Sequence, residues 1–400
     1  MTSVRPCGGR TIYLNEPSGR GRAPEAARRA RPEAGAKIRR VTAAAHNLFG
    51  LDLRGLEEVV SGLGEPAFRA RQLYAWLYRR RVRDFAAMSN LSKPLRERLA
   101  EQYVVVWPEW TDRQLSYDGT RKYLFRLADG ATVESVYIPE QRRRTICIST
   151  QAGCPLKCAF CLTGIAGYTR NLKAGEILGQ VATVMAEEPP REMAWNIVVM
   201  GMGEPLLNYE ATVAALRILM DPDAFSVAPK KLTLSTVGIL PALERLASEP
   251  VRPNLAISLH APTAELRRRL MPIEEKYGIE EVVAAARRYP IPRGGLVTYE
   301  YVLLRGVNDA PEHAQALVRL LKGSRAKLNL IPLNPAPAIP FEPPSEEAVE
   351  AFCQILSAAH FTVSVRRSRG QDILAACGQL HLKERSRSLP AASASPAAAS

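Results

Sequence analysis

The chain has 400 residues, of which 46% are hydrophobic, and its 54 Lys and Arg outweigh 40 Asp and Glu to give a formal net charge of +14. This length allows one large domain with appendages or two to three domains, and the charge favours nucleic acid as a partner over an acidic lipid surface. We expect no membrane span and no secretory signal, so the 7 cysteines should be reduced, in the cytoplasm, and serve metal binding or catalysis.

The first hundred residues divide in two by composition. Residues 1–45 are rich in Arg and Ala with few acids, which predicts a disordered basic arm; a transit peptide has a similar composition. Residues 46–101 are expected to form a helical, RNA-binding accessory domain. Helix formers at 70–78 lead into an arginine run that fits either a solvated helix end or an RNA-facing patch. These arginines are Arg79, Arg80, Arg81 and Arg83.

A short antiparallel β-meander is predicted for residues 102–144. Two turn signals, Asp118-Gly119 and Asp129-Gly130, separate runs that are rich in Tyr, Val, Phe and Leu. Glu134 lies in the last of these runs, where strand alternation puts it on the apolar face of Val136 and Ile138. Apolar surroundings favour a protonated carboxylate, which suits a group that takes up a proton, although an exposed strand edge is the ordinary alternative.

From residue 145 to 382, short apolar runs alternate with helical stretches. Strands are predicted at 145–150, 195–200, 231–236, 254–259, 297–303 and 327–332. Helices are predicted at 173–187, 208–220, 239–248, 279–289, 310–323 and 345–359. Six such units predict an α/β fold, a partial (β/α)6 TIM-like barrel, with a flat doubly wound sheet as the alternative. A last strand at 361–366 precedes a Ser/Ala/Pro-rich tail, 383–400, that we expect to be disordered.

Three cysteines follow the first of these strands in the run CPLKCAFC: Cys154, Cys158 and Cys161. A structural zinc site needs four ligands, and ferredoxin-type runs use two-residue gaps and a fourth cysteine. Cys147, upstream on the strand itself, is a candidate for a fourth ligand. The other strands also end in polar or glycine residues, which is where parallel barrels collect their chemistry.

The CxxxCxxC spacing on a first strand-to-helix loop resembles the radical S-adenosylmethionine superfamily. Six motifs in order narrow this resemblance to the RlmN family, relatives of Cfr, over residues 50–380. The motifs are QAGCx3Cx2C, GMGEPLLN, LSTVG, ISLHAP, NLIPLNP and RGxDIxAACGQL. Thr150 departs from the family, which commonly has a serine at this position.

The resemblance implies an RNA methyltransferase that modifies an adenine carbon, C2 in RlmN and C8 in Cfr, of 23S rRNA and a subset of tRNAs. It implies one 4Fe–4S cluster, held by Cys154, Cys158 and Cys161, whose fourth iron binds S-adenosylmethionine. Two S-adenosylmethionine molecules per turnover, an external electron donor and a monomeric enzyme are part of the same expectation. A zinc-bound, non-catalytic RNA-binding module is the alternative from another functional class.

Residue roles follow from the same resemblance. Cys377 would carry the methyl group as S-methylcysteine, Cys147 would resolve the RNA adduct through a transient disulfide with Cys377, and Glu134 would accept the adenine proton. Cys147 would then not be a cluster ligand. A set of residues at the strand ends would line the S-adenosylmethionine site, with Glu204 at its amino group. This set comprises Gly203, Glu204, Ser235, Ser258, Leu259, His260 and Asn334.

Overall fold

The computed structural model describes residues 46–141, 143–188, 193–292, 294–366 and 368–380. The arm at 1–45 and the tail at 383–400, both expected to be disordered, lie outside these residues. Within the described segments, no helix is long and apolar enough to cross a membrane.

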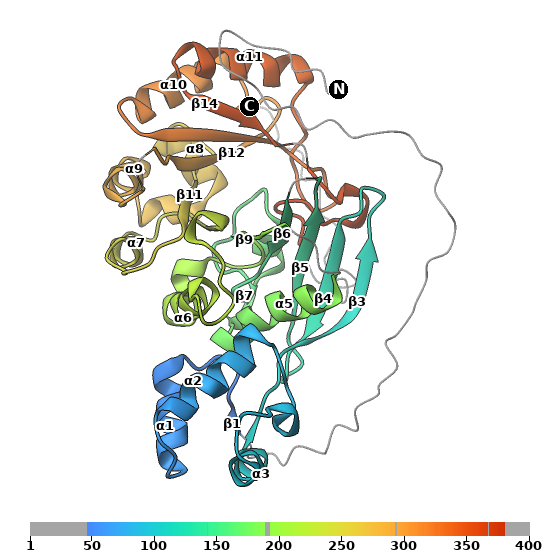
Figure 1. The fold of residues 1–400 in the computed structure, drawn as a ribbon. Helices are drawn as coiled ribbons and strands as arrows, with labels where there is room; N and C mark the ends of the chain where they lie inside the picture. The colour runs from blue at the N-terminus through green and yellow to red at the C-terminus, as the bar shows by residue number, and fades with distance from the viewer. Residues whose placement is uncertain (1–45, 142, 189–192, 293, 367, 381–400) are drawn as a thin grey trace.

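The N-terminal part is a group of short helices at one end of the molecule, blue in Figure 1. It contains α1 (Leu53–Gly62), α2 (Phe68–Tyr74), a π-helical continuation (Ala75–Arg79), a 3₁₀ turn (Phe85–Ala87) and α3 (Lys93–Gln102). Asp52 accepts a hydrogen bond from Gly55 N and begins α1, and Ser92 begins α3 in the same way. Two-residue strands, β1 (His46–Asn47) and β2 (Tyr103–Val104), pair in parallel and close this group.

One ten-stranded sheet forms the rest of the framework, in the spatial order β14-β13-β12-β11-β10-β9-β6-β5-β4-β3. Its antiparallel part is β3 (Glu109–Leu115), β4 (Arg121–Arg126), β5 (Thr132–Pro139) and β6 (Arg144–Cys147). Its parallel part begins at β6 and continues through β9 (Trp195–Val199), β10 (Leu232–Thr236), β11 (Asn254–Ser258), β12 (Val297–Leu303), β13 (Ala326–Pro332) and β14 (Thr362–Val365). The ends of the order are β14 and β3, which do not pair with each other in the described residues, so the barrel is open and partial.

Helices connect the parallel strands and lie along one side of the sheet, as Figure 1 shows. The long ones are α5 (Ala174–Glu187), α6 (Tyr209–Met220), α7 (Leu240–Ala247), α9 (Ile279–Arg288), α10 (Pro311–Leu321) and α11 (Glu346–Ala358). Short ones are α4 (Leu162–Ala166) and α8 (Ala264–Leu270), and 3₁₀ turns lie at Pro205–Asn208, Pro229–Lys231, Pro272–Glu275 and Gln371–Ile373. Each of these long helices falls within a residue or two of its predicted range.

Three features differ from the sequence expectation. The meander, expected as an extension beside the barrel, belongs to the same sheet, because β5 pairs antiparallel with β6. The first barrel strand ends at Cys147 rather than at residue 150. A two-stranded hairpin, β7 (Gln151–Gly153) with β8 (Tyr168–Asn171), brackets the cysteine triplet and was not expected.

Candidate active site

The cysteine triplet lies in a loop held at both ends by backbone hydrogen bonds. Cys154 N donates to Gly167 O at 2.9 Å, and Ala159 N donates to Leu270 O of α8 at 2.9 Å. Gly153 has a φ of +83°, and a Cβ added there would stand 2.0 Å from the Gly167 carbonyl oxygen. Only glycine therefore allows the hairpin to close directly in front of Cys154.

The three thiols of this loop are close enough to influence one another. The pKa of Cys154 is raised to about 12, mainly by burial and also by the Cys161 thiol. Burial also raises the pKa of Cys158, as do the Cys161 and Cys154 thiols. Cysteine binds metal as the thiolate, so a metal bound by these thiols would displace their protons.

A cluster and a single ion make different demands on these thiols. Among the residues that the structure describes, no three His, Cys, Asp or Glu side chains are arranged to hold one metal ion. A 4Fe–4S cluster binds each thiolate to a different iron, so its three sulfurs stand apart rather than meeting at one point. The three thiols therefore fit a cluster that takes one thiolate on each of three irons, and they are one fewer than the four ligands of a structural zinc site.

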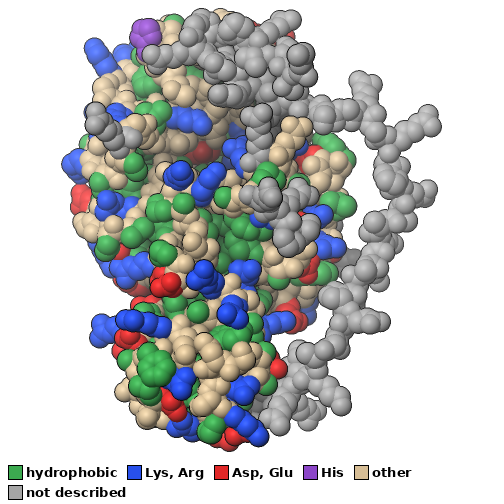
Figure 2. Space-filling model, viewed as in Figure 1, with side chains coloured by type: hydrophobic (Ala, Val, Ile, Leu, Met, Phe, Trp, Pro, Cys, Tyr) green, Lys and Arg blue, Asp and Glu red, His purple; other side chains and the backbone are tan. Residues whose placement is uncertain are grey.

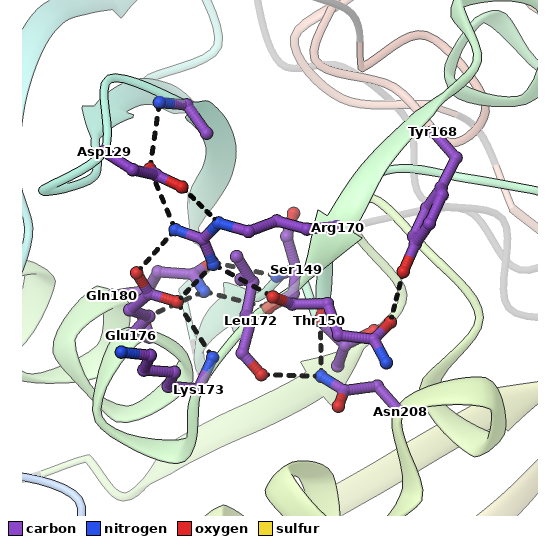
Figure 3. Close-up of polar contacts among 12 residues, drawn as sticks. Asp129, Ser149, Thr150, Tyr168, Arg170, Leu172, Lys173, Glu176, Gln180 and Asn208 are labelled. Atoms are coloured by element: carbon purple, nitrogen blue, oxygen red, sulfur yellow. Dashed lines mark hydrogen bonds and ion pairs between the residues drawn. The ribbon is translucent and has the colours of Figure 1, made fainter.

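Side chains around the β7–β8 hairpin form a hydrogen-bonded network that holds the hairpin, and with it the cysteine loop, in place (Figure 3). Arg170 of β8 donates to Asp129 at 2.5 and 3.0 Å and to Glu176 of α5 at 2.8 Å through each of two nitrogens. Asn208 donates from its amide nitrogen to the carbonyls of Thr150 and Leu172, each at 2.8 Å. The hairpin is thus tied to the meander, to α5 and to the turn before α6.

The GMGEP loop after β9 lies against the same hairpin. Gly203 has a φ of +100°, and a Cβ added there would lie 2.5 Å from the Gln151 Cβ. Glu204 N donates to Gln151 Oε1 at 2.8 Å. The Glu204 carboxylate accepts hydrogen bonds from Leu206 N at 2.9 Å, Thr236 Oγ1 at 2.6 Å and Val237 N at 3.0 Å.

Burial raises the pKa of Glu204 to about 7, against the effect of its three hydrogen-bond donors. Its carboxylate joins the loop after β9 to the loop after β10. The structure thus gives the carboxylate an organising role that the sequence did not indicate. Contact with the amino group of S-adenosylmethionine stays a prediction.

His260 is buried next to the cysteine loop. Its ring meets the Phe160 ring edge-on, with 4.8 Å between centroids, and its Nδ1 accepts a hydrogen bond from Val302 N at 3.0 Å. Burial lowers the pKa of His260 to about 3, and the Arg267 charge adds to this effect. The ring is therefore neutral, with its proton on Nε2, where it can donate to a ligand.

The remaining residues of the predicted cofactor site lie on neighbouring strands. Ser235 Oγ and Ser258 Oγ are 3.2 Å apart on β10 and β11, and the buried Leu259 donates its N–H to Glu300 O at 3.0 Å. Asn334 follows β13 and accepts a hydrogen bond from Gln371 Nε2 at 2.9 Å. Among the described atoms, Asn334 Nδ2 is buried and has no hydrogen-bond partner. A buried donor without an acceptor fits a ligand that carries carboxylate or hydroxyl oxygens, as S-adenosylmethionine does.

Segment 370–380, which carries Cys377, crosses the cysteine loop. Leu162 N donates to Gly378 O at 2.7 Å, and Thr163 Oγ1 donates to Leu380 O at 2.6 Å. Cys377 and Cys147 are both thiols in the structure, and Cys377 lies close enough to Cys147 to raise the pKa of the Cys147 thiol. The structure thus brings together two cysteines that are far apart in sequence.

The surroundings of Cys147 and the neighbours of Cys377 can be followed from their electrostatic effects. The pKa of Cys147 is raised to about 12, mainly by burial and also by the Cys377 thiol, against the effect of the Arg366 charge. The pKa of Arg366 is raised in turn, first by Cys377 and then by Glu300 and Cys147. Burial raises the pKa of Cys161, which Cys377 also raises, so Cys377 lies near both Cys161 and Cys147.

Glu134 is on β5, next to the strand that ends in Cys147, and is buried as the alternation predicted. Its backbone is held by Ser149 Oγ, which donates to Glu134 O at 2.6 Å, and by Met202. Lys122 Nζ of β4 lies 3.2 Å from Glu134 Oε1. The apolar surroundings expected for Glu134 therefore contain a positive charge, which favours the ionised carboxylate.

Sequence reasoning did not single out Lys122, Arg267 or Arg366. Lys122 stands in a run, TRKYLFR, whose alternation places it with Leu124 on one face, and a lysine in such a buried strand was the available signal. Arg267 is one of three consecutive arginines, and the sequence does not distinguish the buried one from its neighbours.

Two family models match the chain: the N-terminal domain of ribosomal RNA large subunit methyltransferases over residues 46–105, and the radical SAM superfamily over residues 148–319. The dual-specificity RNA methyltransferase RlmN of Syntrophus aciditrophicus is 47% identical over 334 residues, 84% of this chain and 96% of the relative. The protein of the same name from Geotalea uraniireducens is 47% identical over 82% of this chain and 94% of the relative.

A solved structure is also similar over most of the chain. A radical SAM methyltransferase from Sphaerobacter thermophilus superposes with a TM-score of 0.79 at 46% identity, covering 84% of this chain and 99% of that one. The expected fold class and the family resemblance are confirmed. A radical S-adenosylmethionine domain implies a 4Fe–4S cluster and S-adenosylmethionine as cofactors. Since identity extends over most of both chains, this protein belongs to the RlmN family of radical S-adenosylmethionine RNA methyltransferases.

Proposed function

We propose that this protein methylates C2 of an adenosine in 23S rRNA and of an adenosine in a subset of tRNAs, through a methylated cysteine. The observation that carries the proposal is that Cys147, Cys377 and the cysteine loop lie near one another at the carboxyl end of β6. Glu134 is on the adjoining strand, β5. Cys377 is far from the others in the sequence, and a packing role alone gives no reason for it to meet them.

The cofactors are assigned to residues as follows. Cys154, Cys158 and Cys161 hold the 4Fe–4S cluster, and the strand-end residues hold S-adenosylmethionine. When bound, these groups supply a methyl group and a one-electron cleavage that starts radical chemistry. The proposed S-adenosylmethionine site consists of Gly203, Glu204, Ser235, Ser258, Leu259, His260 and Asn334. The unpartnered Asn334 Nδ2 and the neutral His260 ring support it with two donors.

The protein's own residues then act in order. Cys377 accepts the methyl group on its sulfur and carries it to the adenine. Glu134 takes the proton from the modified carbon. The Cys147 thiolate attacks the Cys377 sulfur, so that a sulfur–sulfur bond forms and the sulfur–carbon bond breaks. The bonding pair stays with the released carbon, which takes up a proton to become the methyl group, and the methylated RNA leaves. An external electron donor reduces the disulfide before the next turnover.

RNA binding is assigned to the helical accessory domain at 46–101, beside the meander at 102–144 and the barrel at 145–382. Arg80 lies over the Trp76 ring at 4.3 Å and Arg83 over the Trp107 ring at 5.0 Å, which supports a surface of arginine and aromatic groups. In the view of Figure 2, Lys and Arg side chains are spread over the described surface of the molecule, and Asp and Glu side chains are fewer. A monomer acting in the cytoplasm completes the proposal.

Mass spectrometry of nucleosides from rRNA and tRNA tests the substrate and the position of the methyl group. Cells with this protein should contain 2-methyladenosine in both RNAs, and cells without it should lack it. Formation of 8-methyladenosine instead would assign the C8 chemistry. Zinc without iron or sulfide after anaerobic purification would contradict the radical mechanism.

Protein–RNA adducts test the two cysteine roles. Cys147→Ala should accumulate a covalent adduct, because attack on the RNA is retained and release is lost, whereas Cys377→Ala should form none. Cys353→Ala, which alters a buried cysteine of α11, is the matched control and should behave as wild type. Equal adduct levels in the first two variants would overturn the assignment.

A further inference from the structure

A buried lysine connects the proposed base to the segment that carries Cys377. Lys122 Nζ lies 3.2 Å from Glu134 Oε1, and the two side chains are 3% and 4% exposed. The same Nζ donates to Leu374 O at 3.2 Å. Leu374 lies three residues before Cys377, so one ammonium group touches both the carboxylate and the backbone of this segment.

The strands make this arrangement rigid. In the β4–β5 ladder, Lys122 is opposite Val136 and Leu124 is opposite Glu134, so Lys122 and Glu134 share one face of the sheet as diagonal neighbours. On the other side, Leu374 is fixed in a left-handed conformation with a φ of 51°. Its neighbour Ala375 donates its N–H to Gly370 O at 2.9 Å, and Gly370 N donates to Asp118 at 3.0 Å.

Stability is a weak reason for such a pair. Removing two charged groups from water costs several kcal/mol per ion, and apolar residues of similar volume often replace a buried ion pair without loss of stability. A buried lysine beside a buried carboxylate instead marks a candidate functional site, since it determines the charge state of that carboxylate.

We propose that Lys122 is a positioning residue of the methyl-transfer reaction, which holds the ionised Glu134 carboxylate in a fixed place relative to Cys377. The inference rests on the proposed function, which gives Glu134 and Cys377 their roles. Lys122 has three N–H groups; one serves Glu134 and one serves Leu374 O. When the adenine C–H bond breaks, the proton forms an O–H bond on Glu134 and the electron pair stays with the RNA adduct, while Lys122 keeps its charge.

A double-mutant cycle tests whether Lys122 acts through Glu134. The variants are Lys122→Met, Lys122→Arg, Glu134→Gln and the combination of Lys122→Met with Glu134→Gln. Single-turnover RNA methylation is measured at saturating RNA, together with iron content and the mass increase from methylation of Cys377. Lys322→Met, which alters an exposed lysine directly after α10 and outside the accessory domain, is the control.

We expect Glu134→Gln to slow RNA methylation about 100-fold or more and Lys122→Met to slow it at least about 10-fold, both with wild-type iron and wild-type methylation of Cys377. Lys122→Arg should recover most of the rate, since it restores the charge. The double variant should be no slower than Glu134→Gln alone, because two residues that act on one step are not additive.

The outcomes separate this inference from the proposed function. Wild-type methylation by Lys122→Met beside an inactive Glu134→Gln would overturn the role of Lys122 and leave the proposed function intact. Multiplying effects in the double variant, or loss of iron in Lys122→Met, would also overturn it, because Lys122 would then act independently of Glu134 or as a structural residue. Wild-type methylation by Glu134→Gln would remove the proposed base and this inference with it.

Discussion

Replacing Arg267 by methionine should destabilise the protein more than almost any other single change of a charged residue. The Arg267 side chain is fully buried and donates to Glu274 Oε2 at 2.5 Å, to Val237 O at 2.8 Å and to Tyr277 O at 3.2 Å. Without it, the Glu274 carboxylate stays buried with only a donor from Ile279 N at 3.0 Å. Breaking a buried ion pair in this way costs about 3–5 kcal/mol.

Urea unfolding of the metal-free protein at neutral pH measures this loss. Arg268→Met is the matched control, because Arg268 is the next residue on the same helix but is exposed. Its replacement should change the free energy of unfolding by less than about 0.5 kcal/mol. Changing both partners, Arg267→Met with Glu274→Leu, removes the unpaired charge and should recover at least half of the loss.

The same variant should bind less iron. Helix α8 carries Arg267 and also Leu270, whose carbonyl holds Ala159 N of the cysteine loop. A stability of Arg267→Met within about 1 kcal/mol of Arg268→Met, or a double variant less stable than the single one, would refute the account of Arg267 as a compensated buried charge.

Three further predictions concern the site. The pKa of His260 is lowered to about 3 in the folded protein, so His260 alone makes stability fall by about 1.4 kcal/mol per unit as the pH drops below ~6.5. Because the pKa of Glu204 is raised to about 7, which has the opposite effect, the quantity to measure is the difference in unfolding free energy between wild type and His260→Asn at pH 7.5, 6 and 5; it should change by about that slope between pH 6 and 5, and a constant difference would contradict the prediction. Gly153→Ala should abolish iron binding, since its Cβ would stand 2.0 Å from Gly167 O; a wild-type iron content would contradict this. Asn334→Leu should weaken S-adenosylmethionine binding at least about 10-fold by calorimetry, and unchanged affinity would remove Asn334 from the cofactor site.

The barrel was predictable because its signals are local. Apolar runs of strand length alternate with helical patterns, and the run predicted at 297–303 coincides with β12. The cysteine triplet and the glycine-rich loops carry their chemistry within a few residues, so each could be read as a motif. The positions of the proposed cofactor residues at the strand ends follow from the same regular alternation.

Contacts between distant residues were not predictable in this way. Lys122 and Leu374 are 252 residues apart in the sequence, and nothing near either residue indicates the other. Arg267, Arg268 and Arg269 have the same local chemistry, and only the packing of α8 decides which is buried. The β7–β8 hairpin has strands of three and four residues, too short for a periodic pattern to emerge.

The meander and the barrel share one sheet, so a fragment that contains the barrel without the meander would expose a strand that is paired in the intact protein. Strand β6 is hydrogen-bonded on both sides, to β5 and to β9. A fragment that begins at residue 144 would leave β6 with a row of unpaired N–H and C=O groups, which invites association with other chains and aggregation. In the intact protein the edge strand on this side of the sheet is β3. Its Glu109, Asp112 and Arg113 side chains are exposed charges that discourage such pairing. The meander that carries Glu134 therefore also keeps the catalytic sheet from polymerising.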